Sequence, residues 1–313
     1  MAEPSASRRR MKISVITCAH NSRSDYLLRV WEALKSQTFD ITQWEYLFVD
    51  NSSQPPIEPR DCLSWHPATR IVREETLGLT PARLRGIGEA AGELLIFVDD
   101  DNVLDPDFLA VALRTAGEKP FLGSWSGQCR PEFEEPPPEW TRRYWGNLCI
   151  REFDQDVWSN LPRLPDSMPC GAGLCVRREV AHRYLRLHEQ GARAFQFDRT
   201  GDSLLSGGDN DLAACAYEIG LGVGLISTLK LTHLISPQRL TEDYLARLSE
   251  GIYFSGTLLD AKWGKAALPR SAFGHLVDFL RTMRLGPPHR QILRASHRGR
   301  NQAVKLLSSA AND

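Results

Sequence analysis

Gly92-Glu-Leu-Leu-Ile-Phe-Val-Asp-Asp-Asp-Asn102 contains five consecutive apolar residues followed by three aspartates. A short apolar run bounded by turn residues is typical of a strand that is buried on both faces. Like charges a few ångströms apart repel each other, and a divalent cation commonly neutralises such a cluster. The segment therefore predicts a buried strand that ends in a metal-binding acidic cluster. A solvated turn or a helix cap before Pro106 is the alternative.

Comparable strand-like runs lie on both sides of this segment and alternate with helical patterns. Before it we expect strands at residues 12–18, 45–49 and 70–73 and a helix at residues 80–91. We also expect an amphipathic helical segment that Ser24 or Asp25 could cap, with apolar residues at 27, 28, 31 and 34. After it we expect a strand at 170–176, helices near 178–188 and 212–219, and a strand over 221–231 that ends at His233. This alternation predicts an α/β fold with a mostly parallel, doubly wound sheet and helices on both faces. Ligands of such sheets bind beyond the carboxyl ends of the strands, where Asp50 and the cluster at 99–101 lie.

The composition excludes several classes of protein. The chain has 313 residues, of which 42% are hydrophobic and 25% charged, and a net charge of -1 gives no global attraction to nucleic acid. No apolar run approaches the roughly 20 residues that span a bilayer. The seven cysteines are scattered without a Cys-x-x-Cys pair, which argues against a disulfide framework and favours a reducing, cytoplasmic setting. Residues 1–11 are expected to be a disordered leader rather than a signal peptide.

Two regions depart from the strand and helix alternation. Residues 125–169 combine prolines with the tryptophans at 125, 140, 145 and 158, and we expect a long irregular excursion that covers the acceptor side of a site. Its tryptophans either stack on sugar rings or pack against one another. Residues 236–313 are expected to form a helical, basic extension, with no acidic residue between Arg281 and Lys305. That end suits an anionic membrane surface, a solvated tail or an oligomer contact.

Five segments in order resemble the inverting family 2 glycosyltransferases with the GT-A fold. The resemblance covers roughly residues 12 to 235, and its matching pieces are residues 13–21, 49–53, 78–86, 92–102 and 207–212. It implies a hexosyltransferase-like enzyme of the kind used in polysaccharide synthesis. The implied donor is a nucleotide-sugar, most often a UDP-sugar, and the implied acceptor is a hydroxyl of a glycan, a lipid-linked molecule or another compound. A lipid-linked acceptor would place the protein at the inner face of the membrane.

The resemblance also assigns roles to particular residues. It implies that the nucleotide is held by Cys18, Ala19, His20, Asp50, Asn51, Arg83, Asp99 and Asp100. His20 stands where many members have a tyrosine, and either stacks on the base or is a surface histidine. Asp101 and His233 would bind Mg²⁺ or Mn²⁺, which stabilises the diphosphate leaving group as a Lewis acid.

Inversion in one step needs a general base, and the resemblance places it at Asp209. Asp211 is the rival, and a helix N-cap is the other interpretation of Asp209. The glutamate that commonly precedes the base in the family is a glycine here, Gly208.

Two other functions remain open at the level of sequence. A nucleotidyltransferase also places paired carboxylates on a nucleotide-binding sheet, although the loop from Cys18 to Asn21 lacks its usual glycine and lysine. A non-catalytic, sugar-binding derivative of the fold is the second. The joint presence of Asp50, Asp101 and Asp209 argues against it.

Overall fold

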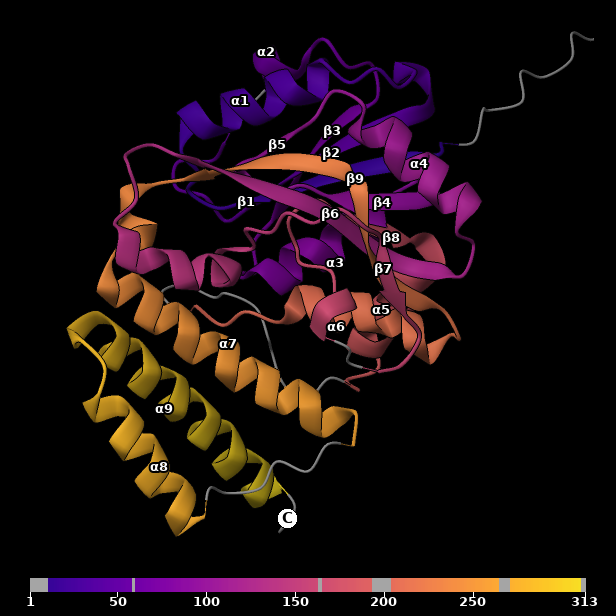
Figure 1. Cartoon of the computed structure of the whole chain (residues 1–313). Helices are drawn as coiled ribbons and strands as arrows, with labels where there is room; N and C mark the ends of the chain where they lie inside the picture. Colours follow the sequence, from indigo (N-terminus) through magenta and orange to yellow (C-terminus); the bar gives the residue numbers. More distant parts are fainter. Residues whose placement is uncertain (1–10, 58–59, 163–164, 193–203, 265–270, 311–313) are drawn as a thin grey trace, which may run out of the picture.

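The computed structural model describes residues 11–57, 60–162, 165–192, 204–264 and 271–310, and Figure 1 shows their arrangement. The predicted leader lies outside these ranges except for Met11. All seven cysteines lie within them and are free thiols.

The first part of the chain forms four parallel strands in the order β3-β2-β1-β4. Their bounds are β1 Ile13–Ala19, β2 Trp44–Asn51, β3 Thr69–Glu74 and β4 Leu94–Phe97. The connections carry α1 Ser24–Lys35, η1 Ile41–Gln43, α2 Arg60–Leu63 and α3 Leu79–Glu89. Ala19 pairs with Asp50 in the register, so the carboxyl ends of β1 and β2 meet at one edge.

The sheet continues through strands of mixed direction. Beyond β4 lie β8 Leu174–Arg177, β6 Leu122–Phe133, β9 Gly222–Ile235 and β5 Asn102–Leu104, and β7 Val157–Ser159 pairs with β9. β6 and β9 are parallel, whereas β8 runs antiparallel to β4 and β6, and β5 and β7 antiparallel to β9. The predicted α/β class with a mostly parallel, doubly wound sheet is confirmed, and the parallel strands are those of the first half together with the β6–β9 pair.

Two sequence predictions are wrong in this half. Trp125 does not open an irregular excursion, because β6 pairs with β8 and β9 at this position. Its side chain is fully buried in the apolar core on one face of the sheet. It is therefore unavailable to stack on a sugar. His233 does not mark the end of its strand, because β9 continues to Ile235 through its pairing with β6.

Helices cover both faces of the sheet, as predicted (Figure 1). One apolar cluster joins one face of the strands to α1 and to α4 Phe108–Glu118. The other joins the opposite face to α3, α5 Arg178–Glu189 and α6 Gly208–Glu218. Alternate residues of β2 divide between them: Tyr46 and Phe48 belong to the first cluster, and Leu47 and Val49 to the second. This is the pattern of a strand that is buried on both faces.

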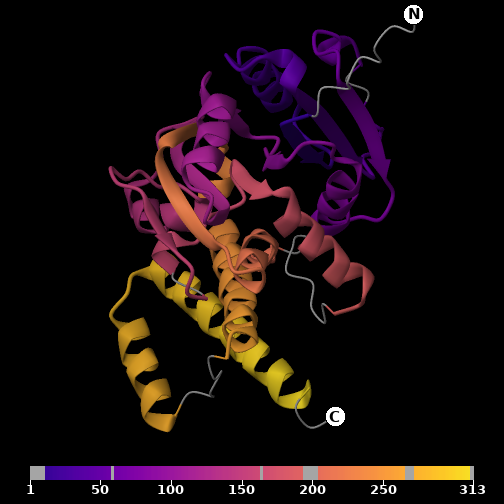
Figure 2. The same cartoon turned by 90° about the vertical axis from the view of Figure 1, so that its right-hand side faces the viewer.

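The C-terminal part is helical. It comprises η4 Pro237–Leu240, α7 Glu242–Lys262, α8 Ala272–Met283 and α9 Pro287–Ala310. α7 and α9 lie side by side, and α8 packs outside them (Figures 1 and 2). A third apolar cluster joins α7 and α9 to η2 Glu139–Leu148. The remaining short helix, η3 Pro165–Ser167, follows β7. None of the helices in the described ranges is long and apolar enough to cross a membrane.

Candidate active site

A cavity of about 370 Å³ opens beyond the carboxyl ends of β1 and β2. All but one of the predicted site residues line it. They are Cys18, Ala19, His20, Asn51, Arg83, Asp99, Asp100, Asp101, Asp209 and His233. They come from six separate segments of the chain, which the fold brings to one cavity. The exception is Asp50.

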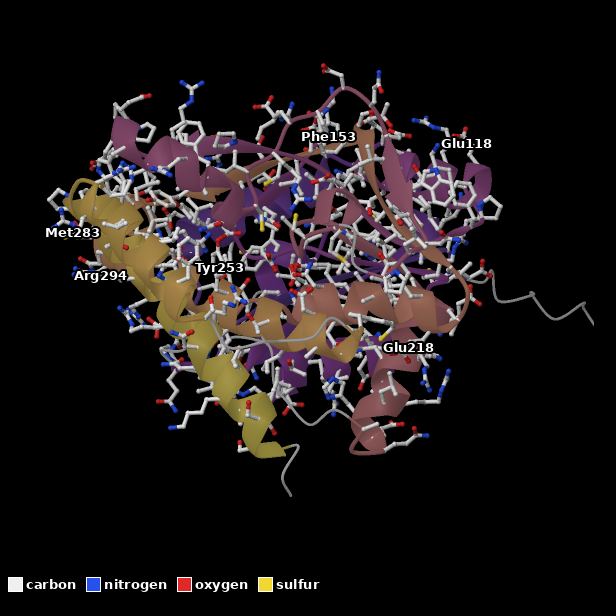
Figure 3. The ribbon with its side chains drawn as sticks, turned by 60° about the horizontal axis from the view of Figure 1, so that its bottom comes forward. Glu118, Phe153, Glu218, Tyr253, Met283 and Arg294 are labelled. Carbon is white, nitrogen blue, oxygen red and sulfur yellow. The ribbon has the colours of Figure 1, made fainter. Side chains whose placement is uncertain are left out.

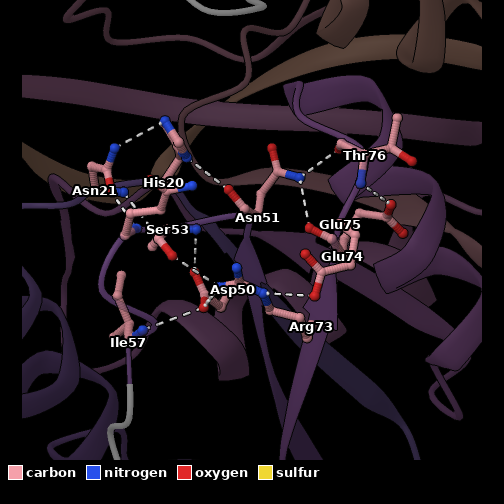
Figure 4. A network of polar contacts seen from close by, with 11 residues as sticks. His20, Asn21, Asp50, Asn51, Ser53, Ile57, Arg73, Glu74, Glu75 and Thr76 are labelled. Carbon is pink, nitrogen blue, oxygen red and sulfur yellow. Dashed lines mark hydrogen bonds and ion pairs between the residues drawn. The ribbon is translucent and has the colours of Figure 1, made fainter.

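Asp50 is buried at the end of β2 and organises a turn (Figure 4). Its carboxylate accepts hydrogen bonds from the backbone N–H groups of Ser53 and Ile57, each at 3.3 Å, and forms an ion pair with Arg73. Burial works against ionisation, but these hydrogen bonds and the positive charge of Arg73 together lower the pKa of Asp50. This geometry favours a structural role for Asp50, which holds the loop after β2, over direct contact with a nucleobase.

Asn51 holds the next loop in the same way. Its side-chain amide donates to the carbonyls of Glu74 and Thr76 at 3.2 and 2.7 Å, and its Oδ1 accepts from the N–H of Gly78 at 2.8 Å. These bonds link the end of β2 to the start of α3 (Figure 4). Asn51 thereby positions the helix that carries Arg83.

His20 closes the other side of this turn. Its Nδ1 lies 2.7 Å from the carbonyl oxygen of Asn51, and since a carbonyl only accepts, Nδ1 carries the proton. Its Nε2 lies 3.1 Å from the side-chain amide of Asn21. The ring is thus fixed at the rim of the cavity, in a position compatible with the predicted stacking.

The three aspartates after β4 occupy one wall of the cavity. Burial, with the neighbouring charge of Asp101, raises the pKa of Asp100 to about 6, while a hydrogen bond from Ser22 opposes the rise. The cluster therefore carries unfavourable like charge, which a cation relieves.

Asp101 faces two partners on β9 and η4. Its Oδ2 lies 2.6 Å from Nη2 of Arg239 and 3.3 Å from Nε2 of His233. His233 Nδ1 lies 3.0 Å from the carbonyl oxygen of Leu148, so Nδ1 carries the proton and Nε2 presents a lone pair. That lone pair accepts from Nη1 of Arg239 at 2.8 Å.

The carboxylate of Asp101 and the imidazole of His233 are suited to bind a divalent cation. A carboxylate oxygen and an imidazole nitrogen converge on one point, and a positive group, the Arg239 guanidinium, already stands there. In the described part of the chain, no three His, Cys, Asp or Glu side chains are grouped closely enough to hold a metal ion. Mg²⁺ and Mn²⁺ commonly take one or two protein ligands and complete their shells with phosphate oxygens and water. Asp101 and His233 match that pattern.

Asp209 stands in the first turn of α6, whose N-cap is Gly207. The predicted N-cap role of Asp209 is therefore wrong, because the helix starts earlier than the apolar periodicity indicates. Its Oδ2 accepts a hydrogen bond of 2.6 Å from the N–H of Gly171. A Cβ atom on Gly171 would lie 3.2 Å from that oxygen and 3.1 Å from Nη2 of Arg83. The glycine lets Arg83 and Asp209 approach the same short stretch of backbone.

Asp211, the rival base, serves another purpose. Its side chain is almost fully buried, and Oδ1 lies 2.8 Å from Nζ of Lys262 on α7. It does not line the cavity among the described residues, so the structure favours Asp209 over Asp211.

A second cavity of about 270 Å³ lies beside the first, and Asn147, Cys149, Ser206 and Asp209 line both. Its further walls include Gly146, Arg151, Met168 and Cys170, as well as Ile252 and Leu259 of α7 and Trp263 directly after that helix. None of the tryptophans at 125, 140, 145 and 158 appears among the described residues that line either cavity. Trp145 instead packs on Phe133, and Trp158 on Phe121.

Sequence reasoning missed the contribution of the C-terminal part to the site. Arg239, Tyr244 and Leu248 line the first cavity although they follow the segment that resembles the family. It also missed Arg151, which lies in the second cavity close enough to Cys170 and Asp209 for their charges to raise the pKa of its guanidinium. For Arg239, the one signal in the sequence was its position six residues after the predicted metal ligand His233.

The α/β architecture, with a polar cavity beyond the carboxyl ends of its strands, is that of the GT-A fold. The family model of glycosyl transferase family 2 matches residues 14–184, and the chain belongs to that family.

Similar proteins agree with this assignment. A Bacillus subtilis (strain 168) protein named "Putative glycosyltransferase EpsH" is 29% identical over 112 residues, which are 35% of this chain and 32% of that protein. The match thus spans about a third of the relative's length. The crystal structure of S. aureus TarS 1-349 in complex with UDP-GlcNAc superposes with a TM-score of 0.57 at 16% identity, covering 91% of this chain and 79% of that one. A longer TarS structure gives a TM-score of 0.52 at 17% identity, covering 81% and 43%.

Proposed function

We propose that this chain moves a sugar from a UDP-sugar to an acceptor hydroxyl with inversion, with the help of Mg²⁺ or Mn²⁺. One observation carries the proposal: a carboxylate–imidazole pair suited to a cation, Asp101 and His233, lines the same cavity as the carboxylate of Asp209. A UDP donor is further supported by the TarS structure of the same fold, which was solved with UDP-GlcNAc.

The chain's own groups account for binding and proton transfer. His20 would contact the nucleobase, and Asp99 and Arg83, which line the same cavity, would contact the ribose and the diphosphate. Asp101 and His233 would hold the cation, which when bound stabilises the negative charge of the leaving diphosphate.

Asp209 supplies the base. Its carboxylate takes the proton of the acceptor hydroxyl as the hydroxyl oxygen forms its bond to the anomeric carbon. The bond from that carbon to the diphosphate breaks on the opposite face, and UDP leaves with the electron pair. The hydrogen bond from Gly171 fixes the carboxylate in one orientation. A base held in this way meets the geometric demand of an in-line displacement.

The second cavity is the natural place for the acceptor. Asp209 stands between the two cavities, so a hydroxyl entering from the second reaches the base directly. Apolar side chains from α7 are suited to the carbon face of a sugar ring or of a similar acceptor.

A donor panel tests this function. Thermal unfolding is measured with UDP-, GDP- and dTDP-sugars, each with and without Mn²⁺, and the best donor is then assayed for transfer by product mass. Stabilisation by one UDP-sugar that depends on Mn²⁺ supports the proposal. Release of a sugar 1-phosphate instead of a nucleoside diphosphate would indicate nucleotidyl transfer, and no response to any donor would indicate a non-catalytic derivative.

A variant of Asp101 tests the metal separately. Asp101→Ala removes one of the two protein ligands, and metal-dependent turnover should fall below detection while the fold is retained. Turnover equal to wild type, in buffers with and without EDTA, would contradict the assigned role.

We further propose that α8 contacts an anionic membrane at the cytoplasmic face. Phe273, Val277, Leu280 and Met283 recur on one side of this helix and are 74%, 39%, 50% and 56% exposed. Arg284 follows them directly, and Figure 3 shows Met283 and Arg294 on the side formed by the C-terminal helices. Exposed apolar residues beside basic ones are typical of helices that lie in a lipid interface.

Vesicle sedimentation tests the membrane contact without deleting the extension. A truncation is unsuitable, because α9 supplies Ile292 and Ala295 to a core shared with α7. Phe273→Ser with Leu280→Ser should instead move the protein from the pellet to the supernatant with vesicles that contain phosphatidylglycerol. Equal recovery of both proteins in the supernatant would reject the contact.

A further inference from the structure

Arg239 stands at the position that the proposed cation would take. Its two terminal nitrogens divide between the two metal-ligand candidates: Nη2 lies 2.6 Å from Oδ2 of Asp101, and Nη1 lies 2.8 Å from Nε2 of His233. The guanidinium thus engages the very oxygen and lone pair that a metal ion needs. Both candidates are nearly inaccessible, with side-chain exposures of 6% and 7%.

The surroundings of Arg239 favour its positive charge. Burial acts against that charge, but Asp101, Tyr244, Asp100 and Asp99 outweigh it and raise the pKa of the guanidinium. Arginine stays protonated at any physiological pH. The charge at this point is therefore permanent, and a divalent cation has to displace the guanidinium to reach both ligands.

We propose that Arg239 is a latch on the cation site, which holds Asp101 and His233 until a nucleotide diphosphate arrives. This inference rests on the proposed function of the same site. Arg239 lines the cavity itself, so a diphosphate bound there offers the guanidinium a new anionic partner. A guanidinium matches phosphate oxygens in a two-pronged geometry, whereas its two present contacts go to different side chains.

The position of Arg239 in the fold suits such an exchange. It lies in η4, a four-residue segment between β9 and α7, and its side chain is 23% exposed. Asp101 directly precedes β5, and His233 lies within β9 opposite Asn102. Their side chains are held by hydrogen bonds with Asn102 and Leu148. The ligands are thus fixed, and the long arginine side chain is the part that can move.

The latch makes metal binding and nucleotide binding cooperative. Without nucleotide, a metal ion has to break both contacts of Arg239, and the displaced charge gains no partner. With nucleotide, the diphosphate takes up the guanidinium and also supplies oxygen ligands to the metal. Coupling between two ligands typically changes each affinity by about 5- to 150-fold.

The test measures Mn²⁺ binding directly, by the loss of the free Mn²⁺ electron paramagnetic resonance signal, with and without UDP. In wild type, UDP should tighten Mn²⁺ binding beyond what the chelation of Mn²⁺ by UDP in solution explains. Arg239→Gln should bind Mn²⁺ alone on the order of tenfold more tightly than wild type. It should also lose most of the coupling to UDP and raise the KM of the donor.

Two further variants keep the result interpretable. Arg239→Lys keeps a positive charge but can make only a point contact. Its Mn²⁺ affinity should lie between those of wild type and Arg239→Gln, a graded result that a folding defect would not produce. Arg130→Gln breaks another arginine–aspartate pair, with Asp105, outside the cavity and should leave Mn²⁺ affinity unchanged. Thermal unfolding verifies that each variant is folded.

The outcomes separate the latch from the proposed function. If Arg239→Gln binds Mn²⁺ no more tightly than wild type, and both bind it with UDP, the latch is wrong and the metal site stands. If neither protein binds Mn²⁺ under any condition, both the latch and the metal role are overturned.

Discussion

Gly171 shows how one residue without a side chain shapes the candidate site. Its N–H holds the carboxylate of Asp209, and its missing side chain leaves room for Arg83. An added methyl group would meet both at 3.1–3.2 Å, closer than side chains normally approach. The methyl group would therefore displace the Asp209 carboxylate and the Arg83 guanidinium from their positions.

We predict that Gly171→Ala lowers kcat about 10- to 100-fold, because a base displaced by a fraction of an ångström loses its alignment. The melting temperature should change little. Gly117→Ala in α4, where a methyl group meets nothing within 4 Å, is the matched control and should retain wild-type kcat. Steady-state kinetics decide the matter: equal kcat in all three proteins would contradict the positioning role of Gly171.

His66 gives the fold a measurable dependence on pH. It is buried against Trp44 and Trp65, with a ring separation of 4.1 Å from Trp44, and its Nδ1 accepts from the N–H of Ala68. Burial lowers the pKa of His66 from 6.5 to about 4, although the charge of Glu45 opposes the shift. Between these values the unfolded chain binds a proton that the folded chain excludes. Stability should therefore rise with pH over this range and fall as the pH drops from 6.5 to 4.

Urea unfolding of wild type and His66→Phe at several pH values measures this effect. From pH 7 to pH 4, the stability of wild type relative to the variant should fall by as much as about 3 kcal/mol. The difference in stability between the two proteins cancels the contributions of the other groups that titrate in this range, Asp100 among them. Parallel stability curves would show that His66 is not buried in its neutral form.

At the scale of elements, the C-terminal helices belong to the fold and are not a detachable tail. A Cβ atom on Gly299 of α9 would lie 2.1 Å from the carbonyl oxygen of Glu250 on α7, so the two backbones touch. Arg298 and Glu250 add an ion pair of 2.6 Å beside this contact. Part of the basic charge read from the sequence is thus engaged with α7 and does not face a membrane.

We predict that Gly299→Ala destabilises the protein by about 1–3 kcal/mol, because the methyl group forces α9 away from α7. Gly88→Ala in α3 is the control, since its methyl group meets nothing within 4 Å, and it should stabilise by up to about 1 kcal/mol. Denaturant titrations of the three proteins provide the comparison. A neutral effect of Gly299→Ala would mean that the helices are not in close contact.

The elements themselves were predictable where local pattern defines them. The predicted strands at 12–18 and 94–98 agree with β1 and β4 within one residue, because apolar runs and following turn residues mark their ends. β6 was not predictable, since its partners β8 and β9 come much later in the chain and the prolines and tryptophans of its neighbourhood suggest a loop. Non-local pairing overrides local composition there.

At the scale of the whole molecule, the sequence indicated which residues form the site but not how they pair. The topology gathers ten of the eleven predicted residues around one cavity, as expected for strand ends at one edge of a sheet. Asp50 was misplaced because its neighbour Arg73 lies on another strand, and Arg239 was missed because η4 returns to the cavity only through the course of β9. Such partners become visible only when the chain is folded.

The central claim is that this cavity binds a UDP-sugar and that Asp209 takes the proton in the transfer step. It is tested most directly by titrating wild type and Asp209→Asn with UDP-GlcNAc and Mn²⁺ and then measuring UDP release, with Asp211→Asn as a structural control. We expect Asp209→Asn to bind the donor as wild type does while its turnover falls about 10²- to 10⁴-fold, and Asp211→Asn to lose stability but not turnover. Full turnover by Asp209→Asn, or the loss of turnover in Asp211→Asn alone, would contradict the account.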